Sequence, residues 1–131
     1  MRDIRQQLKQ LKERLPETDA AKKVAAAAEA LDQKIASVQD QLIDLRITSN
    51  EDSLAYPFGL DGKLAVLAMN IESAATAPTQ PEIDLFQKYS RRLDDDLTKW
   101  SGILTSDLAA FQKLTDEQHL HAIVVSANAS Q

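Results

Sequence analysis

Two histidines near the C-terminus, His119 and His121, are the residues whose type and spacing first suggest chemistry. On an extended segment, side chains two residues apart point the same way and could supply two ligands to one metal ion. A metal site needs at least one further ligand, and the sequence places none beside them. We therefore expect surface histidines without a metal and no cofactor. The long helical stretches contain no histidine, which excludes a histidine phosphotransfer bundle.

The carboxylates do not form a recognisable catalytic or metal set either. No Glu-x-x-His motif is present, so a di-iron bundle site is excluded. Asp94, Asp95 and Asp96 are consecutive, and at about 100° per residue on a helix they point in different directions. We interpret them as a solvated face. The sequence has no cysteine, no Gly-x-Ser-x-Gly and no glycine-rich phosphate loop, so we predict no catalytic residue and no enzyme activity for this chain.

Two side chains that small bundles use for cofactors or sugars are expected in the core instead. Met69 lies beside an apolar helical stripe, where a methionine fills space more often than it binds haem. Trp100 lies on such a stripe and is interpreted as a core anchor rather than a sugar-stacking residue.

The stretch SNEDSLAYPFGLDGKLA, residues 49–65, is dense in oxygen groups and is the best candidate for binding. As a ligand site, it would bind calcium or a carbohydrate. As a connector, its polar side chains would satisfy the unpaired backbone groups of two helix ends, and its apolar ones would cover the core. We favour the connector and keep binding as the alternative. The candidate residues are Asn50, Glu51, Asp52, Ser53, Tyr56 and Asp61.

Composition and charge narrow the classes of partner. Aromatic residues make up only 5% of the chain and apolar residues 44%, which favours helix-on-helix packing of aliphatic side chains. The net charge is −5, but residues 1–15 carry five basic and two acidic side chains, so the remainder carries −8. An acidic body repels phosphate backbones, and we expect no nucleic acid as partner. No apolar run is long enough to span a membrane, and no signal peptide precedes the first helix.

Four segments with helical periodicity are separated by the prolines. They cover about residues 2–15, 19–47, 61–75 and 79–114, with Thr18 or Asp19, Asp61, and a Thr79–Glu82 capping box as the helix starts. Each has an apolar stripe, and in the fourth it comprises Ile83, Phe86, Leu93, Leu97, Trp100, Leu104, Leu108 and Phe111. Gly102 indicates a bend or a close contact. These patterns predict an all-α, up-and-down four-helix bundle with a long loop between the second and third helices.

The C-terminus differs from the helical segments. The apolar, β-branched residues 122–125 predict a short extended segment against the bundle, and residues 126–131 a frayed, flexible tail. We expect one domain, residues 1–125.

The stretch at residues 49–57 and 60–65 also resembles a pattern near the C-terminus of large bacterial BNR-repeat proteins. Their β-propellers are similar to those of sortilin-type vacuolar sorting receptors and are labelled glycosyl-hydrolase-like. The resemblance extends to residues 93–108, around Lys99 and Trp100, and to residues 122–125. It implies a helical C-terminal domain of an exported parent, periplasmic or extracellular. Any hydrolase activity would belong to the propeller, which this sequence lacks.

The leading functional hypothesis is a non-catalytic accessory or interaction domain whose partner is the parent's propeller or another protein. The alternative is a module that binds carbohydrate or calcium through residues 49–61. A third hypothesis is a homodimer formed through the stripe of the second helix, where apolar residues alternate at +4 and +3 from Val24 to Leu45.

Overall fold

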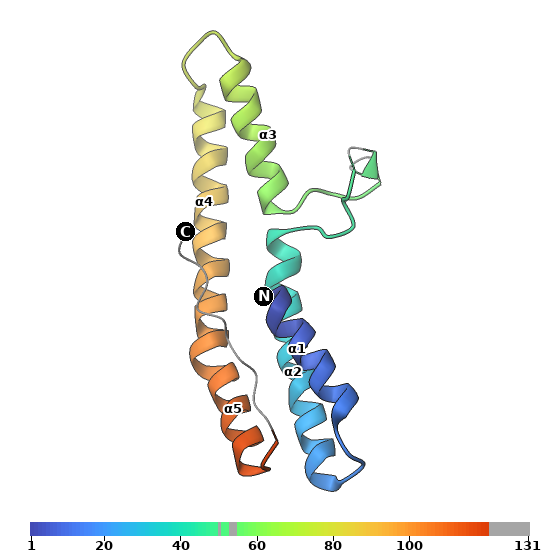
Figure 1. Ribbon diagram of the computed structural model, residues 1–131. Coiled ribbons are helices and arrows are strands. Elements are labelled where there is room, and N and C mark those ends of the chain that lie inside the picture. Colours follow the sequence, from blue (N-terminus) through green and yellow to red (C-terminus); the bar gives the residue numbers. More distant parts are fainter. Residues whose placement is uncertain (50, 53–54, 121–131) are drawn as a thin grey trace. The chain divides into compact units, whose positions relative to one another are not determined.

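The computed structural model describes residues 1–49, 51–52 and 55–120, and all long elements in these ranges are helices (Figure 1). The helices are α1 (Arg2–Arg14), α2 (Asp19–Leu42), α3 (Leu60–Ser73), α4 (Gln80–Gly102) and α5 (Leu108–Glu117), with a π turn, η2 (Ile103–Asp107), between the last two. Because α4, η2 and α5 follow one another without a break, they correspond to the predicted fourth helix. The described residues contain no strand. The predicted all-α class with four helices packed as a small bundle is confirmed.

Two predicted helix starts are confirmed by their side chains, and one is wrong. Thr18 Oγ1 accepts a hydrogen bond from Ala21 N at 3.2 Å, so Thr18 caps α2. The Glu82 carboxylate accepts hydrogen bonds from Thr79 N at 2.7 Å and Thr79 Oγ1 at 2.8 Å, which closes the capping box of α4. Asp61 was predicted to cap α3, but the capping position is Gly59 and Asp61 lies in the first turn.

The contacts divide the chain into two compact units, which we describe separately. The first comprises Met1–Ala36 and the chain from Ser101 onward; the second comprises Ser37–Trp100. Since α2 and α4 run through both, the single domain of residues 1–125 stays a prediction. The extended segment predicted at residues 122–125 and the tail at 126–131 lie outside the described residues.

The first unit packs α1, most of α2 and α5 around an aliphatic core. Its fully or almost fully buried side chains are Ile4, Leu8, Ala21, Val24, Ala28, Leu31, Ile35, Ile103, Leu108 and Phe111. Each buried Leu or Ile contributes roughly 1.5–3 kcal/mol relative to an exposed one. Ala28 is fully buried, and its small side chain leaves room for a neighbouring helix to lie close to α2.

Ion pairs between helices of the first unit use the basic charge of α1, as expected from the charge distribution. Arg5 Nε lies 2.8 Å from Asp32 Oδ1, and Lys12 pairs with Glu29, so two cations of α1 face carboxylates of α2. Lys34 of α2 pairs with Asp107 at the π turn. These groups are exposed to solvent to different degrees, and solvent screening keeps the contribution of such pairs to stability small.

The π turn changes the helical register between α4 and α5. The N–H of Leu108 donates to the carbonyl of Ile103, a hydrogen bond five residues apart instead of four. Ile103 and Leu108 are both buried, although five residues apart on a regular α-helix they would point about 140° apart. Gly102 precedes this turn, and a Cβ there would meet nothing within 4 Å, so the predicted close contact at Gly102 is wrong.

The second unit contains the end of α2, the loop of residues 43–59, and a hairpin formed by α3 and α4. Among the described residues of this unit, few are buried: Val38 and Gln39 of α2, Gly59 before α3, Leu60 and Leu67 of α3, and Asp96 of α4. The predicted solvated face at Asp94–Asp96 is therefore wrong for Asp96, which is 2% exposed.

Candidate binding loop and exposed apolar hairpin

The second helix ends at Leu42, five residues before its predicted end, because the side chain of Asp44 binds the backbone that follows. Asp44 Oδ1 accepts hydrogen bonds from Arg46 N at 3.1 Å and from Arg46 Nε at 2.9 Å. An aspartate that bonds the N–H two residues on forms an Asx turn, which competes with helix continuation. The hydrogen bonds from the Arg46 guanidinium, and then the one from its N–H, lower the pKa of Asp44 to about 2.

The two ends of the loop meet at Gly59. A Cβ on this residue would lie 2.8 Å from both Asp44 N and Leu42 O, and 2.9 Å from Ile43 Cα. No side chain fits against backbone atoms at these distances, so Gly59 is required for the start of α3 to lie beside the end of α2. The chain between them leaves and returns at nearly the same place, as in an Ω-loop (Figure 1).

Asp52 organises the middle of this loop. Its Oδ2 accepts hydrogen bonds from Thr48 N at 2.9 Å, Thr48 Oγ1 at 2.8 Å and Ser49 N at 2.9 Å. These bonds, with the Thr48 N–H first, lower the pKa of Asp52. The carboxylate oxygen that could have faced a calcium ion therefore already receives three donors from the loop itself.

The other predicted candidates are spread over different positions. Arg46 lies over the ring of Tyr56, with its guanidinium carbon 4.4 Å from the ring centroid, which is a cation–π contact. Glu51 is exposed in a turn, and Asp61 is exposed on α3. Asn50 and Ser53 lie outside the described residues. Among the described residues, the structure thus joins the side chain of Tyr56 to Arg46, while the Tyr56 N–H donates to the Asp52 carbonyl at 3.0 Å.

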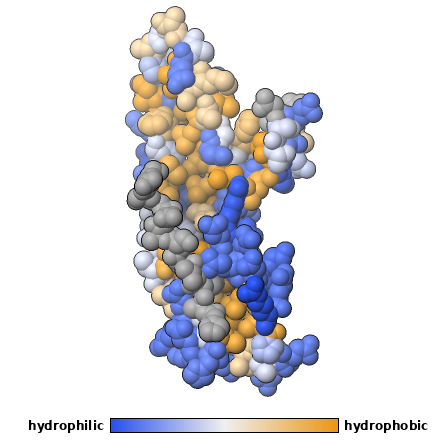
Figure 2. Space-filling model, in the orientation of Figure 1, coloured by the Kyte–Doolittle hydropathy of each residue, from blue (hydrophilic) through white to orange (hydrophobic). Residues whose placement is uncertain are grey.

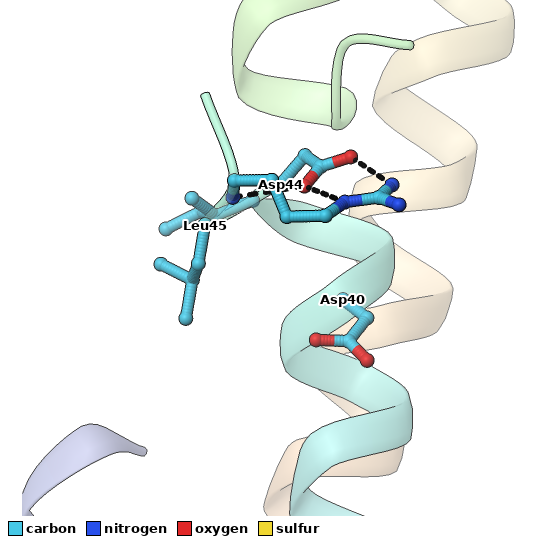
Figure 3. Close-up of a pocket in the computed structure, with 5 residues that line it drawn as sticks. Asp40, Asp44 and Leu45 are labelled. Carbon is cyan, nitrogen blue, oxygen red and sulfur yellow. Dashed lines mark hydrogen bonds and ion pairs between the residues drawn. The ribbon is translucent and has the colours of Figure 1, made fainter. Parts of the chain in front are cut away.

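A pocket of about 390 Å³ lies just before the predicted site, at the end of α2 (Figure 3). Its lining residues are Asp40, Ile43, Asp44, Leu45 and Arg46. This pocket was not predicted, because these residues were expected to continue the helix. The absence of a basic residue in the last turn of α2 is the signal that was available. Carboxylates at a helix C-terminus make the pocket electronegative, although Asp44 is neutralised by Arg46.

His119 has a structural position at the end of α5. It is the only described non-glycine residue with a positive φ, 54°, and its N–H donates to Asp116 O at 3.0 Å while Leu120 N donates to Thr115 O at 2.9 Å. These two bonds form a Schellman motif with His119 in the left-handed position. His121 lies outside the described residues. Within the described ranges, no group of three or more His, Asp or Glu residues is placed to hold a metal.

The distal part of the α3–α4 hairpin, residues 68–88, has no buried residue, and we call this segment the distal hairpin. Its exposed large apolar side chains are Met69, Ile83, Leu85 and Phe86, with Phe86 54% and Met69 62% exposed. Figure 2 shows apolar residues over the visible face of this hairpin, at the top of the view. The predictions that Met69, Ile83 and Phe86 lie in the core are therefore wrong for this chain, and so is the prediction for Leu97, further along α4, which is 47% exposed.

Comparisons with protein-family models, with curated proteins and with solved structures find no match for this chain. Among the described residues, no helix is long and apolar enough to cross a membrane.

Proposed function

We propose that this chain is a non-catalytic helical module that binds another protein through its distal hairpin. The observation that carries the proposal is the complete lack of buried residues from Ala68 to Lys88 in a stretch that contains Met69, Ile83 and Phe86. Two helices alone bury too little surface to be stable in water, and most helical stability comes from packing an apolar face. Exposed apolar side chains gathered on one element are typical of interaction sites.

The resemblance supplies the context of this proposal. In BNR-repeat proteins the helical region follows the propeller, so the parent's propeller is the partner that we propose for the distal hairpin. In that setting the parent is exported, and any hydrolytic chemistry is carried out by the propeller. The role of this chain is to hold or extend the propeller, and none of its residues acts in catalysis.

The first test is the reading frame upstream of Met1. We expect it to encode propeller repeats, and the corresponding polypeptide, produced separately, should bind this chain. Replacing Ile83 and Phe86 together by serine should weaken that binding, because the apolar contact is lost. Lys88→Ser is the matched control, since about 100° per residue places Lys88 on the opposite side of α4 from Phe86. A frame without propeller repeats, or glycoside cleavage by this chain alone, would refute the proposal.

A second candidate function, a module that binds calcium or carbohydrate, is favoured by the pocket of about 390 Å³ at Asp40–Arg46. Its size is within the range of small-molecule pockets. Titration with calcium to millimolar concentration and with a panel of glycans tests it, with tyrosine and tryptophan fluorescence as the readout. Asp40→Asn should remove a calcium response. No response to either class of ligand eliminates this function.

A further inference from the structure

The apolar face of α4 is wider than the part of it that the rest of the protein buries. On the covered side, Tyr89 and Trp100 are half-buried and Asp96 is buried. Ile83, Phe86 and Leu97 lie on a second line, displaced by roughly 80° around the helix at 100° per residue. These three side chains are 39%, 54% and 47% exposed. One flank of the apolar arc is thus left open along about four turns.

The open line has the spacing of a helix-packing seam. Ile83, Phe86, Ser90, Leu93 and Leu97 follow one another at +3, +4, +3 and +4, which is the a and d pattern of a coiled coil. We call these five residues the α4 stripe. A surface with this spacing accepts the side chains of a second helix between its own, so the shape of the expected occupant is helical.

The charged residues of α4 itself that lie beside the α4 stripe are negative. Glu82 and Asp94 flank it, whereas the basic residues of this part of α4, Lys88, Arg91 and Arg92, project from the other side of the helix. Hydrogen bonds from the Thr79 N–H and then the Thr79 hydroxyl lower the pKa of Glu82, so this carboxylate keeps its charge at neutral pH. A partner helix that carries Lys or Arg beside its apolar line complements this arrangement.

We propose that the α4 stripe binds an amphipathic helix whose apolar line is flanked by basic residues. This inference rests on the proposed function, because it takes the same hairpin as a protein-binding surface, but the occupant that it names is a helix and not the β-propeller itself. A second copy of this chain is the less favourable occupant: it would bring Glu82 and Asp94 of one stripe against the carboxylates of the other, and like charges at these flanking positions oppose pairing.

Two synthetic helical peptides test the inference. Both have leucine at the a and d positions; one has lysine and the other glutamate at the flanking positions. The fluorescence anisotropy of labelled peptides measures the binding. The lysine peptide should bind more tightly than the glutamate peptide, and its binding should weaken at high salt. Phe86→Ser should weaken the binding of the lysine peptide about tenfold or more, as expected for a side chain at the centre of an interface. Lys88→Ser should leave this binding unchanged. Asp94→Lys should shift the preference toward the glutamate peptide.

Several outcomes overturn the inference. Equal binding of the two peptides, no binding of either, or an unchanged preference in Asp94→Lys removes the basic helix as partner. If the chain alone sediments as a dimer, and Phe86→Ser converts this dimer to a monomer, the α4 stripe binds a second copy of the chain instead. If the upstream polypeptide binds and the lysine peptide does not, only this inference fails. If the peptide binds and the upstream polypeptide does not, the propeller as partner fails.

Discussion

Asp96 and Leu97 are neighbours on α4, and the aspartate is buried whereas the leucine is 47% exposed. Lys99 Nζ lies 3.1 Å from Asp96 Oδ1, but Oδ2 is buried and has no hydrogen-bond partner among the described residues. Burying a carboxylate oxygen without a donor costs free energy, since its hydration is lost and not replaced. The chain therefore keeps a polar group where its covered face would accommodate an aliphatic one.

Replacing this aspartate by leucine should stabilise the fold. Asp96→Leu removes the unpaired oxygen and fills a similar volume, so we expect the free energy of unfolding to rise by about 1–2 kcal/mol. Urea unfolding followed by circular dichroism measures it. Leu97→Ser is the control one residue away and should change stability by about 0.5 kcal/mol or less, because this side chain is half exposed. A loss of stability in Asp96→Leu would contradict the interpretation.

The three glycines should respond differently to the same substitution by alanine. Gly59→Ala places a Cβ 2.8 Å from backbone atoms of Leu42 and Asp44, so we expect a loss on the order of 1–3 kcal/mol. Gly102→Ala has open space around it in a helical backbone and should gain about 0.5–1 kcal/mol. At Gly62 the new methyl meets the Phe58 side chain, and we expect a smaller loss than at Gly59.

The same unfolding measurement ranks these variants. The opposite signs at Gly59 and Gly102 are the essential result, and a loss at Gly59 beyond the few tenths to about 1 kcal/mol of an ordinary capping change indicates the backbone clash, since glycine is also preferred to alanine at a capping position. Equal effects would show that the loop ends are not held together as described.

Acid should weaken the loop through Asp44 and Asp52. Both have a folded pKa below the ordinary value of 3.8, about 2 for Asp44. A lowered folded pKa contributes stability that is fully present above pH 3.8 and is lost as the pH falls through the folded value. Asp52→Asn should therefore be less stable than the native chain at pH 7, and the difference should shrink as the pH falls through the lowered pKa of Asp52. Urea midpoints across this range test the convergence, and a constant difference would exclude the carboxylate as the cause.

His119 occupies a backbone position that favours glycine. Its φ of 54° is strained for a residue with a Cβ, so His119→Gly should raise the free energy of unfolding by about 0.5–1 kcal/mol. His119→Asn, which tolerates this conformation better than most residues, should give a smaller gain. Thermal unfolding of the three proteins provides the comparison. If neither variant is more stable than the native chain, the backbone at His119 is not strained.

The sequence predicted the helices well because their signals are local. Proline positions, the Thr18 cap and the Thr79–Glu82 box depend on residues within one turn of each other, and the structure contains each of them. Which side of α4 is buried was not predictable from such local signals. Its apolar residues fit two lines that differ by less than a quarter turn, and only the placement of neighbouring helices decides which line is covered.

The candidate site was located only approximately. Asp52 and Tyr56 lie in the predicted loop, but Arg46, the partner of Tyr56, was assigned to the end of the second helix, and Thr48, the partner of Asp52, follows the predicted end of that helix. The Asx turn at Asp44 depends on a choice between two local hydrogen-bonding patterns, and sequence periodicity favoured the wrong one. The contact of Gly59 with Leu42 joins residues far apart in sequence, which no local pattern indicates.

The meeting of the loop ends at Gly59 makes residues 45–58 separable from the helices, because the backbone that lies against Gly59 ends at Asp44. Because the start of α3 lies against the end of α2 whatever the chain does in between, the length of this segment is free to vary, and each doubling of loop length costs only about 0.6 kcal/mol in closure entropy. The segment is thus an exchangeable cassette. A binding sequence could be inserted there, or the loop replaced by a short linker, while the helices on either side keep their register.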